Sequence, residues 1–392
     1  MRLLHIHVRA VLFLAISLLL CGQAIAQTAA PADVTLTASD GAKLKATYFA
    51  AAKPGPGIVL LHQCNQDRKS WTAFATHAAE RGYHVIAMDY RGFGESDGER
   101  FTTFQARQPV IDQQWPGDVD AAFAYLTKQP GVDGQRIAAA GASCGVNQAV
   151  LLARRHPEVK TVVLLSGGVT PPAREHLRRS PGMPVLASAS QGDGDAVNTM
   201  RWILGWSSNP ANKFIEYKAA GHGTEMFAAE KGLEPAMLDW FDAHLRNAPL
   251  KPVTTSVPTT PTPLEEFWNV LAKPDGRERA LQLIEATKRR DPKLVLFPEG
   301  ELNAYGYQIL QSGNANHAVW LFQLNADTYP NSANTYDSLS DALLAAGNRT
   351  EALRNAEKAL EVLGGDKSVP DEFRAAIRES AEKKVRELKK GS

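Results

Sequence analysis

Residues 136–145 have the sequence Arg-Ile-Ala-Ala-Ala-Gly-Ala-Ser-Cys-Gly, a short apolar run that ends in the pattern Gly-x-Ser-x-Gly. Apolar residues then continue at helical spacing, at Val146, Ala149, Val150 and Ala153. The pattern therefore lies between a predicted buried strand and a predicted helix. Glycines two residues before and two residues after a serine let strand and helix pass closely, so that the serine occupies a sharp turn with its hydroxyl exposed. We predict Ser143 as a nucleophile.

Short apolar runs alternate with amphipathic segments through the first 250 residues of the chain. The predicted strands are residues 34–38, 43–50, 57–62, 83–89, 136–141, 161–166, 183–189 and 214–217. The first two flank Ser39-Asp40-Gly41 and predict an antiparallel hairpin. Helical segments separate the others, which predicts an α/β fold with a doubly wound, mostly parallel sheet.

A serine nucleophile needs a general base, and His222 is the candidate. It lies in Ala220-Gly221-His222-Gly223, between the last predicted strand and the helical segment 233–246. A glycine-flanked turn at that point lets the imidazole reach the carboxyl edge of the sheet. Core or surface roles suit the other histidines in or beside helices and strands, which are His77, His84, His156 and His244.

An acidic side chain after the second-to-last predicted strand, residues 183–189, would orient the imidazole and stabilise its charged form. Two carboxylates follow that strand, in Gln191-Gly192-Asp193-Gly194-Asp195. We predict Asp193 as the acid because its distance from the strand suits a loop position. Asp195 stands where it would cap the next helix, and it remains the alternative acid.

Attack on a carbonyl group creates an oxyanion, which two backbone N–H groups commonly stabilise. Cys144 follows the nucleophile and would supply one of them at the start of its helix. For the second we predict Gln63, in the loop after the strand 57–62, with Cys64 as the alternative. Cys64 and Cys144 would then lie on facing loops, and both a disulfide between them and two buried thiols are compatible with the sequence.

Four motifs between residues 34 and 245 resemble the dienelactone hydrolase-like branch of the α/β-hydrolases. They are Leu-Leu-His-Gln-Cys-Asn-Gln-Asp-Arg (60–68), Asp-Tyr-Arg-Gly-Phe-Gly-Glu-Ser-Asp-Gly (89–98), Gly-Ala-Ser-Cys-Gly (141–145) and Gly-His-Gly (221–223). The resemblance implies an α/β-hydrolase fold, in which nucleophile, acid and base follow in the order Ser143, Asp193, His222. Dienelactone hydrolases carry cysteine at the position of Ser143, the centre of the Gly-x-Ser-x-Gly pattern. The serine found here favours general hydrolysis of carboxylic esters through an acyl-enzyme.

A linker divides the chain into two predicted domains. Residues 251–263 have the sequence Lys-Pro-Val-Thr-Thr-Ser-Val-Pro-Thr-Thr-Pro-Thr-Pro, which cannot form regular backbone hydrogen bonds at its prolines. We therefore predict a hydrolase domain over residues 33–250 and a helical domain over residues 264–392.

The helical domain contains an internal repeat. Gly313 and Gly347 are 34 residues apart (347 minus 313), as are Ala318 and Ala352. This spacing resembles tetratricopeptide repeats over residues 302–363, about two units. Such a stack normally needs more units, so helical segments near 264–289 and 371–390 must help to bury it.

The first residues predict export. Arg2 and Arg9 precede the apolar run 10–20, and Ala24-Ile25-Ala26 provides the small residues that a signal peptidase requires. We expect residues 1–26 to be a cleaved signal peptide and the mature protein to be periplasmic or secreted, with no membrane association after cleavage.

The charge balance limits the classes of partner. Lysine and arginine number 43 against 42 aspartates and glutamates, so there is no bulk field that attracts nucleic acid or acidic lipid. We expect a small-molecule ester as substrate, and no cofactor or metal. Two rival hypotheses remain. One is a peptidase or amidase with the same triad, and the other is a noncatalytic scaffold whose helical repeats bind a protein partner or a second copy.

Overall fold

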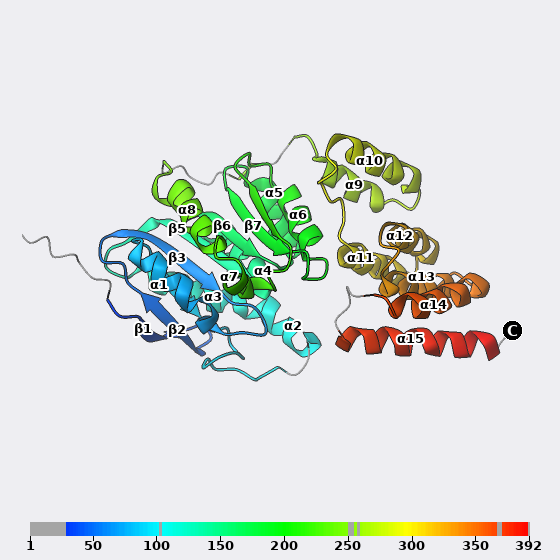
Figure 1. Cartoon of the computed structure of the whole chain (residues 1–392), viewed down its shortest axis with the longest axis horizontal. Coiled ribbons are helices and arrows are strands. Elements are labelled where there is room, and N and C mark those ends of the chain that lie inside the picture. The colour runs from blue at the N-terminus through cyan, green and yellow to red at the C-terminus, as the bar shows by residue number, and fades with distance from the viewer. Residues whose placement is uncertain (1–28, 102–103, 250–254, 257–258, 367–370, 391–392) are drawn as a thin grey trace, which may run out of the picture.

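The computed structural model describes residues 29–101, 104–249, 255–256, 259–366 and 371–390. The predicted signal peptide, residues 1–26, lies outside the described residues, as do residues 251–254 and 257–258 of the predicted linker. Figure 1 shows an α/β part, coloured blue to green, beside an all-helical part, coloured yellow to red.

One eight-stranded sheet forms the centre of the α/β part, in the order β1-β2-β4-β3-β5-β6-β7-β8. Its strands are β1 Ala32–Thr37, β2 Lys43–Phe49, β3 Gly55–Leu61, β4 His84–Met88, β5 Val132–Ala142, β6 Val159–Leu165, β7 Val185–Ser190 and β8 Lys213–Tyr217. β1 pairs with β2 and β2 with β4 in the antiparallel sense, and the remaining pairs are parallel. The predicted fold class is therefore confirmed.

Both faces of the sheet are buried, because successive apolar side chains of one strand enter different cores. Ile58 and Leu60 of β3 pack with helices α1 (Thr72–Glu80) and α8 (Leu233–Phe241). Val59 and Leu61 point to the opposite face. The helices that cover that face are α3 (Trp115–Thr127), α4 (Cys144–Arg155) and α6 (Ala196–Gly205). A π-helical turn, Asp242–Arg246, continues α8.

Three short helices of the α/β part were not predicted from the sequence. They are α2 (Phe104–Gln113), α5 (Pro171–Arg179) and α7 (Met226–Ala229). Pro109 lies inside α2, and Pro171 and Pro172 begin α5. Proline is unfavourable inside a helix, so Pro109 hid α2 from the sequence pattern, whereas proline is well tolerated in the first turn, where α5 has it.

Seven helices form the described C-terminal part. They are α9 (Pro263–Leu271), α10 (Arg277–Arg290), α11 (Glu299–Gln311), α12 (Ala315–Thr328), α13 (Ala333–Ala345), α14 (Arg349–Leu363) and α15 (Asp371–Lys390). α11 and α13 begin 34 residues apart (333 minus 299), as do α12 and α14 (349 minus 315). Gly313 and Gly347 occupy the equivalent turns with φ of 85° and 81°, the left-handed region that glycine favours. The helical character is thus confirmed, and the assignment to tetratricopeptide repeats stays a prediction.

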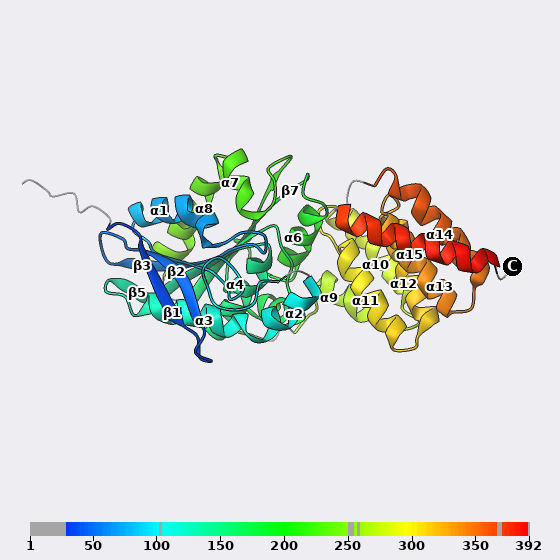
Figure 2. The same ribbon diagram turned by 90° about the horizontal axis from the view of Figure 1, so that it is seen from below.

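The two parts pack directly against each other. The rings of Trp202 in α6 and Trp268 in α9 lie 5.9 Å apart between centroids. Arg174 of α5 places its guanidinium 4.9 Å from the Trp202 ring and donates to Glu301 of α11 at 2.8 Å. As Figures 1 and 2 show, α6 and α9 lie on the sides that face each other. The apolar core therefore continues from the sheet into the helical part.

Candidate active site

Ser143 stands at a sharp turn between β5 and α4. Its backbone has φ 51° and ψ −114°, a left-handed φ that is costly for a residue with a Cβ. A Cβ at Gly141 would lie 2.0 Å from the carbonyl oxygen of Gly145, and one at Gly145 would lie 2.3 Å from that of Leu61. Only glycine fits at both places, so these two residues allow the close passage of strand and helix that forms the turn.

His222 and Asp193 meet at the same edge of the sheet. Asp193 follows β7, and His222 lies between β8 and the 3-10 turn Gly223–Glu225. The imidazole Nδ1 is 2.7 Å from Asp193 Oδ2. Because a carboxylate only accepts, Nδ1 carries the proton and Nε2 of the neutral ring has a free lone pair. That nitrogen is the one a general base uses.

Electrostatics at His222 favour its protonated form. The hydrogen bond with Asp193 is the main reason that the pKa of His222 lies above its ordinary value of 6.5, and burial opposes it. Glu225 adds attraction, and its carboxylate accepts from the backbone N–H of His222 at 3.1 Å. This arrangement stabilises an imidazolium, the species that forms when a base takes a proton from serine.

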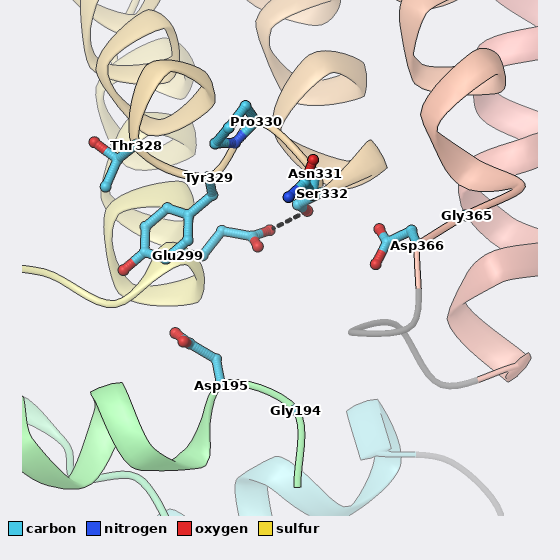
Figure 3. Close-up of a pocket in the computed structure, with 10 residues that line it drawn as sticks. All are labelled: Gly194, Asp195, Glu299, Thr328, Tyr329, Pro330, Asn331, Ser332, Gly365 and Asp366. Carbon is cyan, nitrogen blue, oxygen red and sulfur yellow. Dashed lines mark hydrogen bonds between the residues drawn. The ribbon is translucent and has the colours of Figure 1, made fainter. Parts of the chain in front are cut away.

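Asp195, the alternative acid, serves another region. It occupies the N-cap position of α6 as expected, but no side-chain cap bond forms, and its carboxylate accepts from Asn198 Nδ2 at 2.7 Å instead. Burial raises the pKa of Asp195. Its side chain lines a cavity of about 310 Å³ against the helical part, where Glu299 stands opposite (Figure 3).

A disulfide joins the two loops on which the oxyanion donors are predicted. Cys64 and Cys144 are bonded, with their Cα atoms 5.6 Å apart. Cys144 is the first residue of α4, where a backbone N–H has no acceptor within its own helix. The loop after β3 thus stands against the residue that follows Ser143.

Hydrogen bonds fix the peptide of Gln63 in that loop. Its carbonyl accepts from His62 Nδ1 at 2.7 Å and from the Gln66 N–H at 3.1 Å. His62 Nε2 accepts from the Tyr90 N–H at 3.3 Å, so the histidine is a neutral bridge between two loops. Burial lowers the pKa of His62, which keeps it in that neutral state.

The structure also reveals contacts that the sequence analysis missed. The side chain of Gln63 bonds to Thr224, in the turn after His222, across 161 residues of chain, and no local pattern indicates such a pair. The contact of Glu225 with His222 had a signal, because a glutamate three residues after a cap is a known helix-start pattern. In the part of the chain that the structure describes, no group of three or more acidic, histidine or cysteine side chains is placed to hold a metal ion.

Residues 56–229 match the family model described as alpha/beta hydrolase fold. Together with the sheet order and the serine turn, this match shows an α/β-hydrolase fold in the N-terminal part, as the sequence resemblance implied. None of the described helices is both long and apolar enough to cross a membrane.

Several known proteins are similar to this chain. An uncharacterised 31.7 kDa protein from the traX-finO intergenic region of Escherichia coli is 35% identical over 109 residues, which are 28% of this chain and 36% of that protein. A thiohydrolase of Aspergillus aculeatus is 29% identical over 112 residues, 28% of this chain and 33% of its own length. The chain thus spans about a third of the length of these curated relatives. A dienelactone hydrolase structure from Anabaena variabilis has a TM-score of 0.44 and 18% identity, and the alignment covers 55% of this chain and 99% of that one.

Proposed function

We propose that this protein is an exported serine hydrolase that cleaves carboxylic esters through an acyl-enzyme. Ser143 is the nucleophile, His222 the general base and Asp193 the acid that orients it. The observation that carries the proposal is the 2.7 Å contact of His222 Nδ1 with Asp193, at the sheet edge where β5 ends in the strained turn of Ser143. This combination matches the roles that a catalytic triad requires.

The reaction proceeds by two acyl transfers. Ser143 Oγ attacks the ester carbonyl carbon while its proton moves to His222 Nε2, and the carbonyl oxygen becomes an oxyanion. Backbone N–H groups of Cys144 and Gln63 stabilise that oxyanion. The intermediate collapses, the C–O bond breaks, and the alcohol leaves with the proton from His222. Water, activated by the same imidazole, then hydrolyses the acyl-enzyme and restores Ser143.

Export belongs to the proposal. Residues 1–26 have the pattern of a signal peptide, and a disulfide between Cys64 and Cys144 suits an oxidising compartment. The similarity to a thiohydrolase makes thioesters the second substrate class to test, because an acyl-enzyme forms from a thioester in the same way.

The test is hydrolysis by the purified protein of matched acetyl substrates, namely a nitrophenyl ester, a thioester and an anilide. Ser143→Ala and His222→Ala are assayed beside it. We expect the ester to be cleaved fastest and both variants to lose about three to six orders of magnitude in kcat. An inactive wild-type protein in which a fluorophosphonate leaves Ser143 unlabelled would contradict the proposal. A preference for the anilide would support the amidase instead.

A further inference from the structure

The side chain of Gln63 connects two parts of the candidate site that are far apart in sequence. It is fully buried, and its Oε1 accepts from the backbone N–H of Thr224 at 2.8 Å and from the Thr224 hydroxyl at 3.0 Å. Its Nε2 donates to Asn65 Oδ1 at 2.8 Å. Both ends of the amide are therefore hydrogen-bonded. One end bonds to the histidine turn, which is His222 with the 3-10 turn Gly223–Glu225, and the other to the loop of Gln63 itself.

The histidine turn is shaped to receive this amide. Gly223, between His222 and Thr224, has φ of 58°, and a Cβ there would lie 2.2 Å from Gln63 Oε1. Any other residue would push the amide away from Thr224. The 3-10 turn thus approaches Gln63 closely, and His222 is the residue that directly precedes it.

The opposite side of the same loop is fixed to the nucleophile. Cys64, the residue after Gln63, is bonded through its sulfur to Cys144, which directly follows Ser143. A continuous connection therefore runs from the serine turn through the disulfide and the Gln63 amide to the histidine turn.

We propose that the Gln63 side chain is a positioning residue that holds His222 in register with Ser143. This inference rests on the proposed function and goes beyond it, because that function assigns Gln63 only a backbone N–H. A shift of about 1 Å between base and nucleophile is enough to lower a rate about 100-fold, so two hydrogen bonds that fix the histidine turn have a measurable effect on catalysis.

The test is a double-mutant cycle with Gln63→Leu and His222→Ala, measured as kcat and KM for nitrophenyl acetate. Gln63→Leu keeps the buried volume and removes the hydrogen bonds to Thr224 and Asn65. We expect kcat to fall about 10- to 100-fold with KM little changed. In the His222→Ala background the same substitution is expected to have no further effect, because a residue that acts through the imidazole has nothing left to position.

Gln148→Leu is the matched control. Gln148 is a fully buried glutamine of α4 with one hydrogen bond, to the carbonyl of Ile111 at 3.3 Å. This bond does not reach the histidine turn, so we expect Gln148→Leu to have the wild-type kcat. If Gln63→Leu fails to fold, Thr224→Val removes the hydroxyl bond to Gln63 from the other end and leaves the backbone N–H bond in place. A smaller fall in kcat is then expected, and Thr224→Ser should recover most of the rate that Thr224→Val loses.

Three results would overturn the inference. Gln63→Leu with the kcat of Gln148→Leu would show that the amide only fills space. Equal losses in the wild-type and His222→Ala backgrounds would show that Gln63 acts on the oxyanion and not through His222. A wild-type protein without esterase activity or fluorophosphonate labelling would remove the proposed function and this inference together, an outcome distinct from the first two.

Discussion

Replacing Asp193 with asparagine tests which carboxylate orients His222. The substitution keeps the size of the side chain but removes the charge that faces Nδ1 at 2.7 Å. An amide can present its NH2 group to Nδ1, which moves the ring proton to Nε2 and leaves no lone pair for Ser143. Because His222 and Asp193 are 34% and 19% exposed, water replaces part of the lost interaction. We therefore expect kcat/KM to fall about 10³- to 10⁴-fold, near the loss known for such a change in a buried triad.

The pH dependence gives a second, independent measure of the same change. The proposed mechanism needs neutral His222, so activity should be lost as the pH falls through the pKa of this residue. In the wild-type protein Asp193 raises that pKa above 6.5, which places the acid limb of kcat/KM above pH 6.5. Asp193→Asn removes the main cause of the increase, and the acid limb should move to lower pH while the maximum falls.

The assay is a pH profile of nitrophenyl ester hydrolysis for the wild-type protein, Asp193→Asn and Asp195→Asn. Asp195 is the matched control, because it lies two residues away and bonds to Asn198. We expect Asp195→Asn to keep the wild-type acid limb. If Asp195→Asn loses activity and Asp193→Asn retains it, the assignment of the acid is wrong.

Three further substitutions have expected outcomes. Cys64→Ala with Cys144→Ala opens a cross-link that spans 80 residues, which should destabilise the protein by about 3–5 kcal/mol in thermal unfolding; an unchanged Tm would contradict this. Gly145→Ala places a Cβ 2.3 Å from a carbonyl oxygen of β3 and should lower the free energy of unfolding by about 1–3 kcal/mol. Gly168→Ala, whose Cβ would have no atom within 4 Å, should keep the wild-type free energy of unfolding. Arg174→Ala removes the ion pair to α11 and the contact with Trp202, and limited proteolysis should cut the linker faster; equal rates would show that other contacts hold the interface.

The sequence was most informative where a structure depends on local pattern. The strand β5 and the helix α4 follow from apolar spacing, and the glycines on either side of Ser143 predict the turn between them. The placement of His222 after the last strand followed from the order of elements, and the structure brings it to Asp193. Each of these features needs only a short segment of chain and a known topology.

Contacts between distant segments could not be predicted in this way. The bonds of Gln63 to Thr224 join loops 161 residues apart, and the cavity at Asp195 depends on where α11 packs. A single sequence carries no signal for either, because the partners are decided by the packing of whole elements. The short helix α5, which begins with two prolines, was missed because its apolar residues are too few to show a period.

Asp193 and Asp195 are separated by one glycine, yet their carboxylates serve different neighbours. The first bonds to His222, and the second faces the cavity against Glu299 of the helical part. Trp202 lies seven residues further along the chain (202 minus 195), and its ring is 5.9 Å from that of Trp268 in α9 of the helical part. The two parts are consequently not interchangeable modules. An N-terminal part cut at the linker would expose a tryptophan surface beside the loop that carries Asp193 and Asp195, so transplanting it would require redesign of that face.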